Sequence, residues 1–102
     1  MQAEKIAVRV PHGIPASMVV EYVQRCNVAL PAARAALVNL DHNYLRIYGH
    51  GLKGSGGGYG IPGLTEAGSQ VEAAAKAGDT PKLHDLLAKL EVYLSRIDIL
   101  PG

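Results

Sequence analysis

Residues 78–97, GDTPKLHDLLAKLEVYLSRI, join a helix boundary to the most regular apolar stripe in the chain. The run from Gly78 to Pro81 supplies a C′ glycine, a capping side chain and a proline for the first helical turn. Apolar side chains then recur every three or four residues, which places them on one face of a helix. These positions are Leu83, Leu86, Leu87, Leu90, Tyr93, Leu94 and Ile97. The stretch therefore predicts one helix that ends at Gly78 and a final amphipathic helix that reaches about Ile97.

Helical spacing of apolar residues also begins far upstream, at Pro15. The first stripe comprises Met18, Val19, Tyr22, Val23, Cys26, Ala29 and Leu30. Pro31 then interrupts the pattern, and because proline lacks a backbone donor and clashes with the carbonyl four residues earlier, we expect a kink or a new helix there. The stripe resumes at Ala33, Ala36, Leu37 and Leu40.

Two further helices are predicted between these segments. Asp41 suits the N-cap of a helix that runs from about His42 to Gly58 and is rich in glycine. Its expected buried stripe is Leu45, Tyr48, Gly49, Leu52 and Gly56. Gly60 and Pro62 mark a stop and a restart. The next amphipathic helix carries Leu64, Ala67, Gly68, Val71, Ala74 and Ala75.

The start of the chain has a different period, because Ile6 to Val10 alternate apolar and polar side chains until Pro11 ends the pattern. We interpret this segment as an arm and expect no second strand after Pro15. Short connections between helices of similar length favour antiparallel neighbours. The predicted fold is therefore all-α: an antiparallel up-and-down four-helix bundle with a short extended N-terminal arm. Residues 1–102 form one domain, with the arm over 1–14 and the helical bundle over 15–98.

Composition excludes several classes of function. Hydrophobic residues make up 48% of the 102 residues and charged residues 19%, which is typical of a soluble globular protein. Lys and Arg number 10 against 9 acidic residues and form no basic cluster, which argues against a nucleic-acid partner. The single cysteine, Cys26, cannot form an internal disulfide. Because the sequence contains neither a signal peptide nor a membrane-spanning run, we expect no membrane association and a cytoplasmic location.

The segment His50–Gly60, HGLKGSGGGYG, is the one stretch that chemistry rather than packing has shaped. At about 100° per residue, His50 lies nearly opposite Leu52 and Tyr48, so burial of those two side chains turns the imidazole outward. The residues within about 60° of His50 on the same helix face are Asn43, Arg46, Ile47, Lys53, Gly54 and Gly57.

These neighbours suit phosphoryl transfer. A neutral imidazole has a nucleophilic nitrogen that can attack a phosphoryl group. Lys53, one turn further along, can attract the phosphate oxygens and offset charge as the group moves. Gly54 and Gly57 leave room for a partner to close over the ring, although each glycine costs about 0.5 to 1 kcal/mol in a helix interior. Ile47 suits a small transient interface, and Arg46 and Asn43 complete the predicted docking face.

The segment resembles the phosphoacceptor signature of histidine-containing phosphotransfer (HPt) domains. In that signature a histidine is followed by x-Leu-Lys-Gly, a small residue, and then an apolar residue and a glycine. The matching residues are His50, Leu52, Lys53, Gly54, Ser55, Tyr59 and Gly60. The resemblance extends from about Val8 to Ile97. It includes Leu64, an Ala-Ala-x-x-Gly-Asp junction over residues 74–79 and the leucine-rich closing helix.

The resemblance implies a phosphorelay intermediate of two-component signal transduction. His50, phosphorylated on its distal ring nitrogen, would accept the group from a receiver-domain aspartate or a hybrid kinase and pass it to another receiver. The implied partners are response-regulator receiver domains and a sensor or hybrid histidine kinase. The magnesium ion is expected on the partner receiver, and no cofactor is expected on this chain. Because the sequence has no nucleotide site, we expect a phosphoryl carrier without its own kinase activity.

Two other interpretations fit parts of the sequence. A helical scaffold or inhibitor with the same bundle would bind kinase or receiver domains without phosphorylation of His50. Residues 49–54, GHGLKG, also match the dinucleotide-binding pattern G-x-G-x-x-G, and Glu72 is near the distance of a ribose-binding acid. That fold requires strands that alternate with helices, which the sequence does not predict. His42 and His50 are too far apart on a helix for joint ligation, so no metal site is expected.

Overall fold

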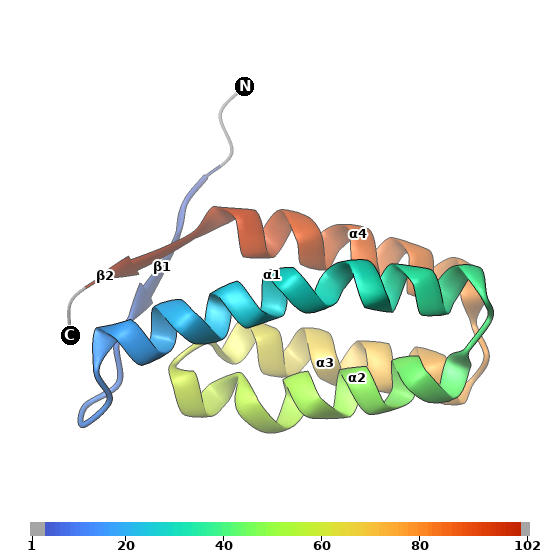
Figure 1. Cartoon of the computed structure of the whole chain (residues 1–102), viewed down its shortest axis with the longest axis horizontal. Coiled ribbons are helices and arrows are strands. Elements are labelled where there is room, and N and C mark those ends of the chain that lie inside the picture. Colours follow the sequence, from blue (N-terminus) through green and yellow to red (C-terminus); the bar gives the residue numbers. More distant parts are fainter. Residues whose placement is uncertain (1–3, 101–102) are drawn as a thin grey trace.

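The four predicted helices lie side by side along the long axis of the molecule (Figure 1). This computed structural model describes residues 4–100, so the first three residues of the predicted arm and the last two of the predicted domain lie outside the described residues. The four helices that lie side by side confirm the predicted helical bundle. The elements are β1 (Ile6–Arg9), α1 (Ala16–Val38), α2 (His42–Ser55), the 3-10 turn η1 (Gly57–Tyr59), α3 (Pro62–Lys76), α4 (Thr80–Arg96) and β2 (Ile97–Leu100).

The apolar stripes of all four helices meet in one core. Its largest fully buried side chains are Leu45, Ile61, Leu64, Leu83, Leu87, Leu90, Val19 and Val71. Two residues of the first predicted stripe were wrongly assigned to the core. Met18 is 45% exposed in the first turn of α1, and Leu40 is 60% exposed in the loop after it, where its φ is 55°. Met18 precedes the fully buried Val19 and lies outside the covered part of the stripe, and Leu40 lies beyond Val38, the last residue of α1.

Pro31 does not begin a new helix. The chain continues through it as one helix of 23 residues, α1. Leu30 before the proline and Ala33 after it are both buried in the same core. Packing on both sides therefore holds the two halves in one helix despite the lost backbone hydrogen bond.

Helices α2 and α3 touch through their backbones at two glycines. A β-carbon at Gly49 would lie 2.6 Å from the backbone nitrogen of Glu72 and 2.8 Å from the backbone oxygen of Gly68. A β-carbon at Gly68 would lie 2.5 Å from the backbone oxygen of Gly49. No other residue type fits at either position without displacing a helix. This contact fixes the position along α2 at which α3 crosses it.

Helix α2 ends three residues before the predicted end at Gly58. Its last residue is Ser55, and the chain then forms η1 and turns at Gly60, whose φ is 80°. The backbone N–H of Gly57 donates to Oγ1 of Thr65 at 2.7 Å, so it is satisfied by a side chain of α3. The glycine run has low helix propensity, and this tertiary bond ends the helix.

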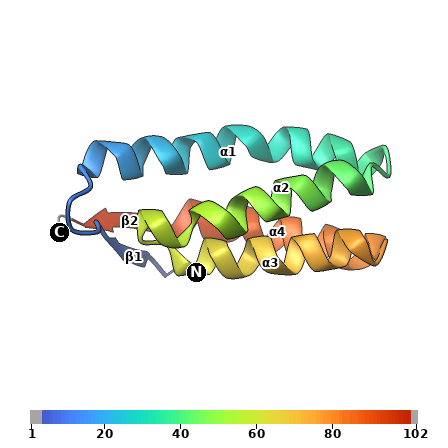
Figure 2. The same ribbon diagram turned by 90° about the horizontal axis from the view of Figure 1, so that it is seen from below.

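A small parallel sheet closes the end of the bundle where α1 begins and α4 ends (Figure 2). Strand β1 confirms the extended arm, but it pairs with β2, with Ile6 opposite Ile97 and Val8 opposite Ile99. The chain is thus mostly helical, as expected, but the expectation of no second strand after Pro15 was wrong. The last helix ends at Arg96, with Ile97 as its C-cap, close to the predicted end at about Ile97. Ile97–Leu100 is too short to show a strand period, and its pairing depends on a segment at the other end of the chain.

The G-x-G-x-x-G run of residues 49–54 lies inside α2, whereas a dinucleotide site needs this run between a strand and the start of a helix. The dinucleotide interpretation is therefore wrong. Among residues 4–100, no helix combines the length and the apolarity that crossing a membrane requires.

Candidate functional site

Helix α2 begins at the predicted residue and turns the predicted residues towards the core and towards solvent. The Asp41 side chain accepts a hydrogen bond from the backbone N–H of Tyr44 at 3.0 Å, which confirms Asp41 as the N-cap. Leu45 and Leu52 are buried against the core. The opposite face consequently points to solvent, and the His50 side chain is 71% exposed.

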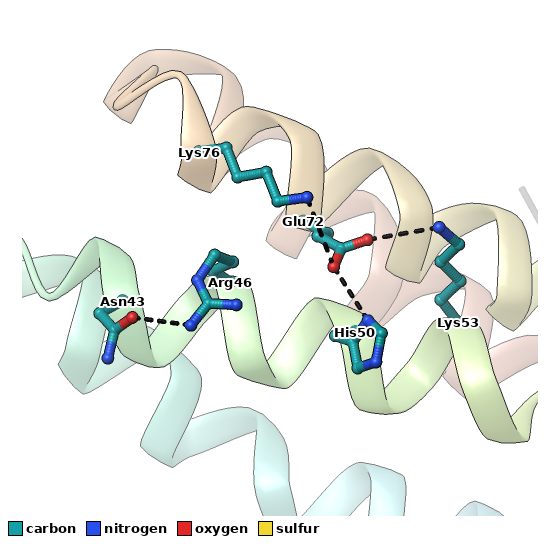
Figure 3. A network of polar contacts seen from close by, with 6 residues as sticks. All are labelled: Asn43, Arg46, His50, Lys53, Glu72 and Lys76. Atoms are coloured by element: carbon teal, nitrogen blue, oxygen red, sulfur yellow. Dashed lines mark hydrogen bonds and ion pairs between the residues drawn. The ribbon is translucent and has the colours of Figure 1, made fainter.

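The imidazole of His50 is held by a carboxylate from the neighbouring helix (Figure 3). Nδ1 of His50 lies 2.9 Å from Oε2 of Glu72, on α3, and only 9% of the Glu72 side chain is exposed. An ionised carboxylate only accepts hydrogen bonds, so Nδ1 carries a hydrogen and donates a hydrogen bond to Glu72. In the neutral ring, Nε2 then carries the free lone pair, and it points away from Glu72.

The same carboxylate gathers two lysines. Nζ of Lys53, on α2, is 3.5 Å from Oε1 of Glu72, and Nζ of Lys76, on α3, is 3.9 Å from Oε2. Burial acts to raise the pKa of Glu72, but the hydrogen bond from His50 and the charges of Lys76 and Lys53 outweigh it and hold that pKa below its ordinary value. Glu72 is therefore ionised at neutral pH.

The other predicted site residues surround this cluster without joining it. Arg46 donates to Oδ1 of Asn43 at 3.0 Å, towards the start of α2 (Figure 3). Ile47 is 56% exposed. A β-carbon at Gly54 would meet no atom within 4 Å, so this position is open, whereas Gly57 lies in η1 beyond the end of α2. The structure thus joins His50 to Lys53 through Glu72 and leaves the others as a rim.

A groove of about 260 Å³ separates α1 from α2 beside the histidine. Its floor contains Tyr22, whose hydroxyl is 2.7 Å from Oγ of Ser55 and whose ring stacks on Tyr59 at 4.1 Å between centroids. Burial raises the pKa of Tyr22 to about 12, so this hydroxyl stays protonated. Ser55 also donates to the backbone oxygen of Gly51 at 2.8 Å, one helical turn earlier. The remaining lining residues are Arg25, Cys26, Ala29, Ile47, Tyr48 and Leu52.

Glu72 is the functional residue that sequence reasoning missed, since it was considered only as a ribose-binding acid. Its position carried a signal. It follows Gly68 by four residues and precedes Ala75 by three, so an acidic side chain falls on the face that packs against α2. A buried acid needs a partner, and His50 and Lys53 are the nearest candidates across the α2–α3 crossing.

In the described part of the chain, no group of three or more His, Cys, Asp or Glu side chains is arranged to hold a metal ion. Comparisons of the chain with protein-family models, curated proteins and solved structures find no match. The geometry around His50 is therefore the basis for a functional assignment.

Proposed function

We propose that the chain is a histidine-phosphotransfer protein of the HPt type. In this proposal His50 carries a phosphoryl group between receiver-domain aspartates as an intermediate of a two-component phosphorelay. The observation that carries the proposal is the pairing of an exposed imidazole with a buried carboxylate. Glu72 orients the ring and fixes its tautomer, which leaves Nε2 as a solvent-facing nucleophile.

The chemistry at His50 is an in-line displacement. Nε2 attacks the phosphorus of an aspartyl phosphate on the partner, the N–P bond forms, and the O–P bond breaks with its electron pair returning to the aspartate. Lys53 is half exposed and lies one turn from His50, so its ammonium group can attract the phosphoryl oxygens. The partner receiver supplies its own magnesium ion and most of the charge stabilisation.

The rim of the site suits a partner that docks briefly. Ile47 offers exposed apolar area beside His50, and Gly54 leaves open space next to it. Arg46 and Asn43 lie towards the start of the same helix, and Gly57 lies in η1, beyond the end of that helix. The groove between α1 and α2 is lined in part by Ile47, so a receiver domain that covers Ile47 also meets this recess.

Two further features belong to this proposal. The helices follow an antiparallel up-and-down order, which is supported by the short connections between α1 and α2 and between α3 and α4. The protein acts in the cytoplasm with a sensor or hybrid histidine kinase and response-regulator receivers. It carries the phosphoryl group without kinase activity of its own.

The test is phosphoryl transfer from receiver domains of the source organism that have been charged with a small-molecule phosphodonor. We expect the chain to gain acid-labile, base-stable phosphate, His50→Gln to gain none, and His84→Gln, at an exposed position of α4, to behave as the unaltered chain does. Transfer from no receiver, or undiminished transfer to His50→Gln, contradicts the proposal. A receiver that binds both proteins equally and phosphorylates neither would instead identify a scaffold or inhibitor.

A further inference from the structure

The contact between His50 and Glu72 constrains where protons can be during transfer. Nδ1 of His50 and Oε2 of Glu72 are 2.9 Å apart, and only 9% of the Glu72 side chain is exposed. If Nδ1 lost its proton, its lone pair would face the lone pairs of an ionised carboxylate at hydrogen-bond distance. That arrangement sets two acceptors against each other and removes the shortest hydrogen bond of the carboxylate, which is unfavourable. The longer contact from Lys53, at 3.5 Å, would remain.

Phosphorylation makes this constraint consequential. In the resting neutral ring, Nδ1 carries the hydrogen and Nε2 the lone pair. Once Nε2 has bonded to phosphorus, a ring that keeps its Nδ1 hydrogen is cationic, and a ring that loses it is neutral. The cationic form releases the phosphoryl group more readily, because its N–P electron pair returns to a positively charged ring. The protonation state of Nδ1 therefore sets the reactivity of the phosphorylated protein.

We propose that Glu72 keeps the Nδ1 proton on His50 throughout the transfer cycle, so that the phosphoryl group enters and leaves without any proton transfer at the histidine. This inference rests on the function proposed above. In the forward step, Nε2 gains the phosphoryl group and the donor aspartate leaves as a carboxylate. In the onward step, an acceptor aspartate attacks phosphorus, and the N–P bond breaks with its electron pair returning to Nε2. The ring is then back in its resting tautomer.

The charged groups that the packed elements bring near the ring are mostly cations, so retention of the Nδ1 proton depends on the direct contact with Glu72. Helix α3 contributes Glu72 and Lys76, and α2 contributes Lys53 and Arg46. Helix α1 faces α2 with Tyr22, Arg25 and Cys26 across the groove. The two lysines oppose a cationic ring. Their Nζ atoms lie 3.5 and 3.9 Å from the nearest Glu72 oxygens, whereas Nδ1 of the ring lies 2.9 Å from Oε2 of Glu72. They keep the carboxylate ionised, and the carboxylate has the shortest contact with the imidazole.

The substitution Glu72→Gln distinguishes two effects of Glu72: the orientation of the His50 ring and the retention of its Nδ1 proton. Its amide has the same shape as the carboxylate, and it can accept from a protonated Nδ1 or, after turning over, donate to a deprotonated one. Glu72→Gln therefore keeps a hydrogen bond to the ring in both states and removes the negative charge. Two matched controls are available on α3. Glu66→Gln removes an exposed carboxylate, and Lys76→Gln removes a cation from the Glu72 carboxylate while leaving Glu72 in place.

The experiment is an NMR titration of the phosphorylated ring. Histidine labelled with ¹⁵N is introduced, His50 is phosphorylated with phosphoramidate, which needs no receiver, and the Nδ1 shift is followed with rising pH. We expect the Nδ1 proton of Glu72→Gln to titrate at least about one pH unit lower than that of the unaltered protein. Glu66→Gln should match the unaltered protein, and Lys76→Gln should titrate no lower. Coincident titrations of Glu72→Gln and the unaltered protein overturn the inference.

Transfer to a receiver gives the second measurement. Above the titration midpoint of its Nδ1 proton, Glu72→Gln should transfer phosphate more slowly by about tenfold per pH unit, while the unaltered protein stays level over the same range. If the transfer rate of Glu72→Gln is lower than that of the unaltered protein by the same factor at every pH, the role of Glu72 is merely structural. That result would contradict the inference. If Glu72→Gln does not fold, Glu72→Asp serves in its place, because it keeps the negative charge. The Nδ1 proton of its phosphorylated His50 must then titrate with the same midpoint as in the unaltered protein. Failure of all receivers would refute the proposed function, whereas the NMR titration would still decide the role of Glu72.

Discussion

The Glu72 carboxylate lies among three nitrogen atoms, those of His50, Lys53 and Lys76, and only 9% of the side chain is exposed. A carboxylate in such a place is tolerated because its charge is matched and its oxygens are hydrogen-bonded. Its ionisation is therefore coupled to folding. Because the folded pKa is lower than the ordinary value of about 4.5, the folded state binds the proton less tightly than the unfolded chain does.

This coupling predicts how stability depends on pH. The contribution of Glu72 is present above its ordinary pKa and is lost as the pH falls through its lower folded pKa. We expect the melting temperature of the unaltered protein to decrease more steeply than that of Glu72→Gln as the pH falls below the ordinary value of about 4.5. The measurement is thermal unfolding followed by circular dichroism at several pH values.

Glu66→Gln is the control for this comparison, because it removes an exposed carboxylate from the same helix. Its melting temperature should follow that of the unaltered protein as the pH falls. If the curves of Glu72→Gln and the unaltered protein run parallel, Glu72 has no depressed pKa in the folded state.

Single residues on α2 could be predicted well from the sequence, but contacts between helices could not. The outward orientation of His50 followed from the positions of Leu52 and Tyr48 on the opposite side of the same helix, where Leu52 is buried and Tyr48 packs against the core. The partner of His50 lies 22 residues further along, on another helix. Its approach depends on a backbone crossing at Gly49 and Gly68 that helical periodicity alone does not specify.

At the scale of the element, α2 contains glycines in two different environments. Gly49 packs against the backbone of α3, whereas a β-carbon at Gly51 would meet no atom within 4 Å. We expect Gly49→Ala to lower the free energy of unfolding by about 1 to 3 kcal/mol, because the new methyl group pushes the helices apart. Gly51→Ala should raise it by up to about 1 kcal/mol, because alanine has the higher helix propensity. Urea unfolding measures both.

The two variants control for each other, since they add the same methyl group two residues apart on one helix. A free energy of unfolding that rises in both variants would show that the α2–α3 crossing does not depend on Gly49. A separation of the helices at Gly49 should also lengthen the contact from Glu72 to His50, so Gly49→Ala should weaken the proton retention described above.

The ends of the helices show where local sequence signals suffice. The Asp41 and Asp79 caps begin α2 and α4 as expected, because a side chain bonds a backbone N–H three residues ahead in each case. The end of α2 was predicted too late, because it depends on the bond from Gly57 to Thr65 of another helix. Pro31 was expected to divide or kink α1, but packing against the other helices overrides the local signal for a break.

At the scale of the whole molecule, β1 attaches the start of the described chain to its end. Val8 is 3% exposed and lies opposite Ile99 in the sheet. Val8→Ala should lower the free energy of unfolding by about 1 to 3 kcal/mol, because it removes buried methyl groups and leaves a cavity. The neighbouring Arg9→Ala, at an exposed position, should change it by less than about 0.5 kcal/mol. Chemical denaturation measures both, and equal effects would mean that the strand is not part of the core.

The bundle could be predicted because each apolar stripe is local to its helix, whereas the sheet joins residues from opposite ends of the chain. The alternation in Ile6–Arg9 indicated an extended segment, but no pattern in the four residues of β2 distinguished a strand from the last turn of α4. The candidate site follows the same rule. Its histidine and lysine share one helix and were found, and its glutamate comes from another.

The parallel pairing of β1 and β2 also has a mechanical consequence. The two strands run in the same direction, with Ile6 opposite Ile97 and Arg9 opposite Leu100. A pull that draws the start of β1 away from the end of β2 therefore slides the strands lengthwise past each other, which loads the hydrogen bonds of the ladder together. The sheet therefore resists such a pull in shear geometry. Tension applied at the start of β1 and the end of β2 must break this ladder before it can unwind the helices that hold His50.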